Sequence, residues 1–202
     1  MHTSTPRGYV RMPDIEFKSP ISYGPISAPD GSVTVEDETA TAKIVVRAAA
    51  GTAAAADLAV PFGQSRLRAD GTLVCGTRPD EWTLFAAIDR ATEVAASVNA
   101  EGFVSVVDIT HGRAMMRVSG PKATAVLAKV CNLDLADDMT PDGAVFSGSV
   151  AEVTCDLLRS DRAGVASYLI SCERSFGNYV FAALVDASTE FGAQLPAGLS
   201  IH

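Results

Sequence analysis

Histidine is scarce in this sequence, and its scarcity excludes several kinds of chemistry. The chain has three histidines: His2 and His202 stand at its ends, and only His111 lies in the interior. Chain ends are commonly frayed unless something holds them in place. A histidine-based metal site or a two-histidine acid–base pair therefore has no material here, and we expect no metal site in this chain.

The cysteines are too widely spaced to form a recognisable metal or redox motif. Cys75, Cys131, Cys155 and Cys172 include no C-x-x-C and no pair with the short spacing of a zinc knuckle. Two disulfides are arithmetically possible, but the sequence shows no export signal, which indicates a reducing compartment. Because each cysteine lies in or beside an apolar run, we interpret all four as small buried thiols.

Basic residues are also few. The chain of 202 residues carries 16 Lys and Arg against 24 Asp and Glu, a net charge of −8, and has no polybasic cluster. Nucleic acids and anionic membranes both require a concentrated cationic surface, so we expect neither as a partner. Residues 1–20 lack the apolar core of a signal peptide, and every long apolar stretch is interrupted by charge. This pattern predicts a soluble, cytoplasmic protein.

Catalytic and cofactor motifs are missing as well. The sequence contains no G-x-G-x-x-G, phosphate-binding loop, H-E-x-x-H or G-x-S-x-G. The nearest fragment, Gly120-Pro121-Lys122, lacks the upstream glycine, and its proline removes an N–H that a phosphate would need. We therefore expect no catalytic residue and no cofactor-binding residue in this chain.

Residues 1–40 differ from the rest, because they hold five of the ten prolines and show no helical or strand period. Such a segment cannot bury enough apolar surface to fold by itself. Its spaced aromatic residues nevertheless favour an extended arm, docked on a partner through Tyr9, Phe17 and Tyr23, over a disordered tail. Residues 41–202 are then expected to form a single domain.

Within residues 41–202 the hydrophobic period alternates between that of paired strands and that of helices. Helices are expected from Ile88, after Pro121 and after Ser175, and strands at residues 43–47, 72–75, 81–85, 104–109, 114–118, 150–158 and 165–172. Helices separated by paired strands predict the α+β class, with largely antiparallel or mixed sheets and three main helices.

Five motifs follow one another along the chain. They are GTRPDEWTL at 76–84, VDITHGR at 107–113 and RSFGNY at 174–179, with RVSGP at 117–121 and CNLDL at 131–135 between the last two. Together these motifs resemble the gamma subunit family of heterotetrameric sarcosine oxidase. The resemblance runs over residues 45–192 in order and at similar spacing, and it leaves residues 1–40 uncovered. It implies a fold similar to the folate-binding domain of the glycine-cleavage T-protein, an aminomethyltransferase.

The resemblance also implies a function. This chain would be a non-catalytic assembly subunit, with alpha, beta and delta subunits as partners that carry FAD, FMN, NAD, tetrahydrofolate and zinc. The assembly would oxidise sarcosine to glycine. The T-protein pattern has an acid used in folate chemistry, but the matching segment here, residues 146–151, has no carboxylate. Two alternatives stay open: a subunit of a related N-methyl amino acid oxidase or dehydrogenase, and a stand-alone folate-binding aminomethyltransferase-like protein.

The candidate site residues are therefore interface residues. Trp82 is expected in core or subunit packing rather than as a stacking platform for a pterin, and His111 as a hydrogen-bonding anchor rather than a general base. Arg113 and Arg174 could clamp a substrate carboxylate, reach an acidic partner or remain solvated. Phe176 is expected on the buried face of the last helix, and Tyr179 is expected to point elsewhere, toward an interface.

Overall fold

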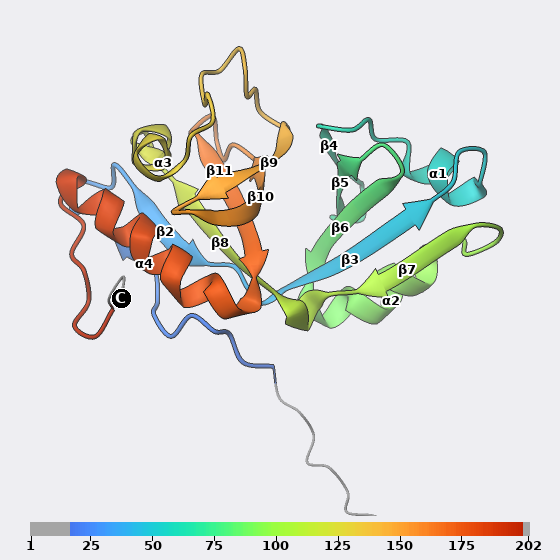
Figure 1. Cartoon of the computed structure of the whole chain (residues 1–202), viewed down its shortest axis with the longest axis horizontal. Helices are drawn as coiled ribbons and strands as arrows, with labels where there is room; N and C mark the ends of the chain where they lie inside the picture. The colour runs from blue at the N-terminus through green and yellow to red at the C-terminus, as the bar shows by residue number, and fades with distance from the viewer. Residues whose placement is uncertain (1–16, 200–202) are drawn as a thin grey trace, which may run out of the picture.

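Two antiparallel β-sheets, joined at one end, form a V-shaped frame in the view of Figure 1. The computed structural model describes residues 17–199. The first sheet has six strands in the order β1-β2-β8-β11-β10-β9, and the second has five in the order β4-β5-β6-β3-β7. The strands are β1 (Ile26–Ser27), β2 (Thr34–Asp37), β3 (Thr41–Ala48), β4 (Ser65–Leu67), β5 (Leu73–Arg78), β6 (Glu81–Ala87), β7 (Val104–Asp108), β8 (Arg113–Ser119), β9 (Val145–Val150), β10 (Val153–Arg159) and β11 (Ser167–Glu173).

Helices cover the outer face of each sheet and leave the inner faces opposite each other (Figure 1). The first sheet packs against α3 (Ala123–Val130) and α4 (Gly177–Ser188), and the second packs against α1 (Ala53–Leu58) and α2 (Ala91–Ser97). The short 3-10 turns are η1 (Ile88–Arg90), η2 (Thr110–Gly112), η3 (Arg174–Phe176) and η4 (Thr189–Phe191). The α+β class with antiparallel sheets is confirmed, although α1 was not predicted.

The core under the first sheet is built from strands and helices with strong apolar periodicity. Strand β11 is buried at every position except its last residue, as expected for a strand in the middle of a covered sheet. The apolar side of α3 contributes Ala123, Val126 and Leu127, the spacing of one helical face. The predicted helix after Pro121 and the strand that becomes β11 follow from these local patterns.

The arm predicted for residues 1–40 is only partly correct. Strands β1 and β2 lie within it, and β2 pairs antiparallel with β8 as part of the first sheet. Val33 and Val35 are fully buried, so residues 33–37 contribute to the core of this chain. The alternation of apolar and polar residues around Val33 and Val35 is too short to predict a strand in a segment rich in proline. Pairing with the distant β8 decides the conformation of this segment. Tyr9 lies outside the described residues.

Two further boundaries differ from the prediction. Strand β9 was not predicted, and the strand expected to begin at residue 150 begins at Val153, because Ala151 and Glu152 form a turn with φ of 48° and 67°. The last helix begins at Gly177, and Ser175 makes no capping hydrogen bond. A Cβ at Gly177 would lie 2.6 Å from the Ala114 Cβ, so close packing on β8 sets this helix start.

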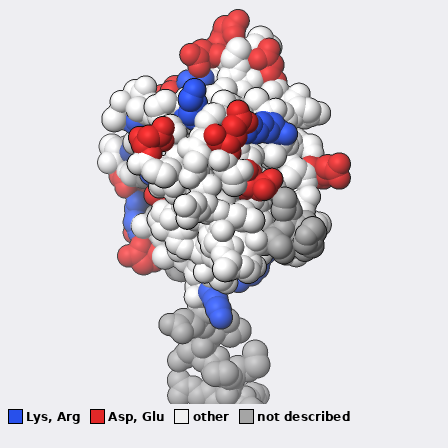
Figure 2. Space-filling view, turned by 90° about the vertical axis from the view of Figure 1, so that its left-hand side faces the viewer, with Lys and Arg blue, Asp and Glu red and all other residues white. Residues whose placement is uncertain are grey.

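The surface charges of both signs are interspersed. Figure 2 shows no continuous basic patch on the face that is turned toward the viewer from the left-hand side of Figure 1. Among the described residues, no helix is both long and apolar enough to cross a bilayer.

Candidate functional site: the cleft between the sheets

The two inner sheet faces enclose a cleft of about 430 Å³. Its closed end is a small apolar cluster that joins the sheets, formed by Cys75 on β5 with Met115, Val145, Leu158 and Leu169 on the first sheet. On β3, β6, β7, β8 and β11 the residues that line the cleft stand at alternate positions, because successive residues of a strand point to opposite faces. The cleft is therefore apolar at its closed end and carries charged groups along its walls.

On the second sheet, the carboxylate at the cleft wall is that of Glu81. Its side chain is only 4% exposed, and it accepts a hydrogen bond of 2.6 Å from Arg47 Nε and others from Arg78 Nη1 and Thr77 Oγ1. Burial raises the pKa of the Glu81 carboxyl, but the hydrogen bonds from Arg47 and Arg78 outweigh it and hold the pKa below its ordinary value. An ionised carboxylate neutralised by two guanidinium groups is a poor general base.

On the first sheet, the matching group is the Arg113 guanidinium, whose side chain is 16% exposed. It donates to Asp156 Oδ2 at 2.7 Å, to Glu173 Oε1 at 3.2 Å and to the Ser171 carbonyl at 2.9 Å. The structure shows a role for Arg113 that is not among the three expected: it forms ion pairs within its own chain. These carboxylates occupy the donors that a substrate clamp would use.

Lys43 lies where the two sheets join, and it is 1% exposed. Its ammonium donates to the Thr39 carbonyl at 2.9 Å and to the Thr41 carbonyl at 2.8 Å. Burial lowers the pKa of Lys43 to about 8. The ammonium thus secures the crossover from β2 to β3, at the cost of removing a charge from water.

His111, Phe17 and Arg174 come together beside the joined end of the sheets. His111 is exposed within η2, and its ring centroid lies 5.2 Å from that of Phe17. The Arg174 guanidinium lies 5.8 Å from the centre of the Phe17 ring and donates to the Lys18 carbonyl. Phe17 therefore contacts its own chain, and this cluster attaches the N-terminal segment to the body.

The remaining aromatic candidates fall into different environments. Trp82 is 6% exposed, and its Nε1 donates to the Val60 carbonyl at 2.8 Å, so it packs in the core of its own chain. Tyr23 stacks on Phe181 with ring centroids 6.5 Å apart, again within the chain. Contrary to the prediction, Phe176 is not buried but 46% exposed, whereas Tyr179 is half-buried against the core.

All four cysteines are buried and free, as predicted. Burial raises the pKa of the Cys75 thiol to about 12. The hydrogen bond between Cys155 and Cys172 raises the pKa of Cys155 and lowers that of Cys172. Over residues 17–199 there is no group of three or more His, Cys, Asp or Glu side chains placed to hold a metal ion.

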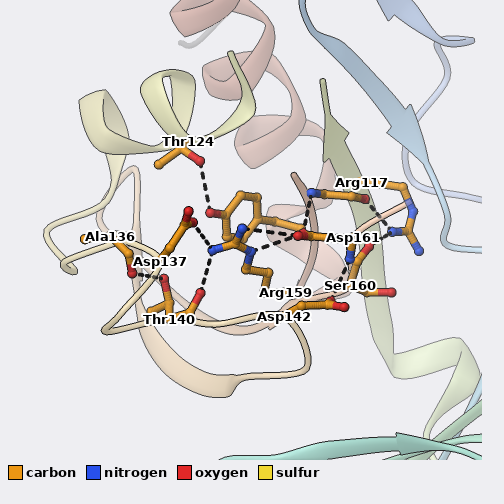
Figure 3. A network of polar contacts seen from close by, with 11 residues as sticks. Arg117, Thr124, Ala136, Asp137, Thr140, Asp142, Arg159, Ser160 and Asp161 are labelled. Carbon is orange, nitrogen blue, oxygen red and sulfur yellow. Dashed lines mark hydrogen bonds and ion pairs between the residues drawn. The ribbon is translucent and has the colours of Figure 1, made fainter. Parts of the chain in front are cut away.

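A polar network that the sequence analysis missed fastens the loop before β9 to strand β10 (Figure 3). Arg159 donates to Asp137 at 2.5 Å, to the Thr140 carbonyl at 2.8 Å and to both oxygens of Asp161 at 3.1 Å. The Arg159 side chain is 8% exposed. The signal available was an arginine at the end of an apolar strand, preceded by the aspartate-rich segment 134–142 and followed by Asp161, but the pairing is set by the fold.

A family model and several known proteins are similar to this chain over most of its length. The family model of the GCVT N-terminal domain matches residues 60–201. Sarcosine oxidase subunit gamma of Arthrobacter sp is 28% identical over 173 residues, covering 81% of this chain and 83% of that protein. The same subunit of Corynebacterium sp. strain U-96 is 27% identical over 175 residues, covering 82% of this chain and 84% of that protein.

The solved structures that are similar include one of an oxidase and one of a transferase. A chain of heterotetrameric sarcosine oxidase from Corynebacterium sp. U-96, in complex with pyrrole 2-carboxylate, matches with a TM-score of 0.71 at 27% identity, covering 85% of this chain and 91% of that chain. Glycine cleavage system aminomethyltransferase T from Bartonella henselae matches with a TM-score of 0.60 at 18% identity, covering 75% of this chain and 45% of that chain, a likeness of fold alone.

These comparisons confirm the resemblance to gamma subunits that the motifs at 76–84, 107–113 and 174–179 indicate. They also confirm the expected likeness in fold to the T-protein. The family model covers well over half of the sequence. The chain belongs to the GCVT N-terminal domain family.

Proposed function

We propose that this chain is the gamma subunit, without an active site of its own, of a cytoplasmic heterotetrameric sarcosine oxidase. One observation carries the proposal: the similarity to gamma subunits extends over most of both chains, and it holds in sequence and in fold. A match confined to one motif could reflect a shared turn. A match over most of the subunit supports a shared place in an assembly.

The charges of the cleft support a non-catalytic role. Glu81 is neutralised by Arg47 and Arg78, and Arg113 is held by Asp156 and Glu173. Proton transfer needs a group whose pKa is near the working pH and whose position allows it to reach the substrate. Here the side chains are instead used in ion pairs that link strands within each sheet.

The alternative of a stand-alone folate-binding aminomethyltransferase requires an acid that is missing at the expected position. Residues 146–151 form most of β9 and the start of the following turn, and they include no carboxylate. Glu152 is nearby but stands in the turn, exposed, with φ of 67°. A stand-alone aminomethyltransferase would need an acid at the folate, so this departure favours a fold kept without that reaction.

The proposed assembly would convert sarcosine, O₂ and water to glycine, formaldehyde and H₂O₂. With tetrahydrofolate in place of water, the products would be glycine, methylenetetrahydrofolate and H₂O₂. The alpha, beta and delta subunits would carry FAD, FMN, NAD, tetrahydrofolate and zinc. A related N-methyl amino acid is the alternative substrate, because in this proposal the substrate pocket lies in another subunit.

Purification of the tagged chain from its own host tests the proposal. We expect the chain to co-purify with flavin-containing subunits that form H₂O₂ when sarcosine is added, and the chain alone to bind neither flavin nor tetrahydrofolate. Purification without partners, or tight tetrahydrofolate binding by the chain alone, would overturn the proposal. Activity of the purified complex on another N-methyl amino acid in place of sarcosine would favour the alternative substrate.

A substitution at His111 separates assembly from chemistry. Because His111 is exposed and packs on Phe17, we expect His111→Ala to reduce the yield or stability of the complex. Turnover per assembled complex should stay unchanged. A large loss of turnover in a correctly assembled complex would show that His111 takes part in the reaction.

A further inference from the structure

Within residues 17–199, the outer edge of β7 is an unpaired row of main-chain groups. Strand β7 stands at the end of the second sheet, and among these residues it pairs only with β3 (Figure 1). Phe103, just before the strand, is 87% exposed, and Val107 within it is 49% exposed. Large apolar side chains beside an open sheet edge are a combination that folded chains usually avoid.

The hydrogen-bond register identifies which groups point outward. The Ala49 N–H donates to the Phe103 carbonyl at 3.1 Å, and the Ile109 N–H donates to the Lys43 carbonyl at 2.9 Å. Hydrogen-bonded pairs alternate along an antiparallel ladder, so Ser105 and Val107 also bond to β3. The N–H and C=O groups of Val106 and Asp108 therefore point away from the sheet.

The other sheet edges in the described part of the chain are short or covered. Strand β1 has two residues and β4 has three. Strand β9 is longer, but its two ends are held by a bridge between Val150 and Cys131 and by a hydrogen bond of 2.9 Å from the Val145 N–H to the Gly63 carbonyl. Only β7 presents a five-residue edge with no such cover.

We propose that this edge of β7 accepts an extended strand of a partner subunit, which pairs with the main-chain groups of Val106 and Asp108. The inference rests on the proposed place of the chain in a hetero-oligomer. Residues 98–112 contain Glu101 and Asp108 and no Lys or Arg, so a strand with a basic residue opposite Asp108 complements the edge. A second copy of this chain would instead bring the same acids together.

The added strand would also complete the cleft. The side chains of Ser105 and Val107 line it, whereas Val104 and Val106 pack toward the helices. Alternate side chains of a strand added beside β7 would follow the same two directions. Apolar residues of the partner would then cover Val107 and extend the cleft wall.

Residue-resolved hydrogen exchange on the purified chain and on the native complex tests the pairing. On assembly, exchange at the Val106 and Asp108 amides should slow by about tenfold or more, whereas the Ser105 and Val107 amides should already be protected in the free chain. A complex that forms without new protection overturns this inference and leaves the proposed function standing. Protection that appears in the chain alone at high concentration indicates a second copy instead. Failure to form any complex overturns both.

Val106→Pro supplies a second test. Proline removes only the outward N–H of Val106, so the ladder with β3 is retained, and Val106→Ala is the matched control for lost packing. We expect the proline variant to bind the partner subunits about tenfold more weakly than the alanine variant, as for one lost main-chain hydrogen bond. Equal binding by the two variants would overturn the inference. If the proline variant does not fold, hydrogen exchange on the unsubstituted complex decides.

Discussion

The buried ammonium of Lys43 predicts that the protein becomes more stable as the pH rises above neutrality. Burial lowers the pKa of Lys43 from 10.5 to about 8. Between these two values the unfolded chain still holds a proton that the folded chain has lost. The free energy of unfolding therefore rises with pH in this window, and it is level below it and above it as far as Lys43 is concerned.

The size of the effect follows from the shift. A change from 10.5 to about 8 is 2.5 pKa units. At about 1.36 kcal/mol per unit, the free energy of unfolding should rise by about 3 kcal/mol across the window. Lys43 is 1% exposed, so solvent screening takes little from this value. The buried thiol of Cys75 acts in the opposite direction above its ordinary pKa, because burial raises its pKa.

Urea unfolding of the unsubstituted chain and of Lys43→Met over this pH range isolates the effect. The contribution of Cys75 is common to both proteins and cancels in the difference between them. The lost hydrogen bonds to Thr39 and Thr41 add an offset at every pH. We expect the stability of the unsubstituted chain relative to Lys43→Met to rise from pH 8 to 10.5.

Lys122→Met, which removes an exposed ammonium, is the matched control and should leave the pH profile of the unsubstituted chain unchanged. Parallel profiles for the unsubstituted chain and Lys43→Met would refute the reasoning, because the ammonium would then be as well solvated in the folded chain as in the unfolded one.

Three further perturbations test the packing. Gly76→Ala would place a Cβ 2.2 Å from the Pro61 carbonyl oxygen and should prevent normal folding, whereas Gly24→Ala, with nothing within 4 Å, should unfold at the same urea concentration as the unsubstituted chain. Trp82→Phe, which leaves a buried carbonyl without its donor, should lower the free energy of unfolding by about 2 kcal/mol in the same assay. Deletion of residues 1–40 removes β1 and β2, so a thermal melt followed by circular dichroism should lose its cooperative transition. A cooperative melt would restore the arm interpretation.

Strong local patterns were sufficient for several elements. The apolar run of β3 and the face of α3 predicted those elements within a few residues. The sequence analysis did not predict strand β9 because the strand contains Gly148. A Cβ at this position would lie 2.4 Å from the Leu133 side chain. Glycine is disfavoured in isolated strands, so here close packing by a distant loop overrode local propensity.

The candidate site was less accessible to sequence reasoning than the fold. Arg113 was selected, but its carboxylate partners Asp156 and Glu173 come from two other strands. Glu81 and Lys43 were not selected, although both line the cleft. Strand parity tells which residues of one strand share a face, but it does not tell which strands become neighbours in a sheet. Ion pairs between strands far apart in sequence therefore cannot be inferred from spacing.

By itself, the sequence determined the α+β class, the resemblance to gamma subunits and the absence of known catalytic motifs, because these depend on residue types and local order. Only the tertiary structure decided that Trp82 belongs to the core, that residues 26–37 complete a sheet and that β7 keeps an open edge. Burial and strand pairing join residues distant along the chain. The environment of a side chain therefore depends on which strands and helices come together around it.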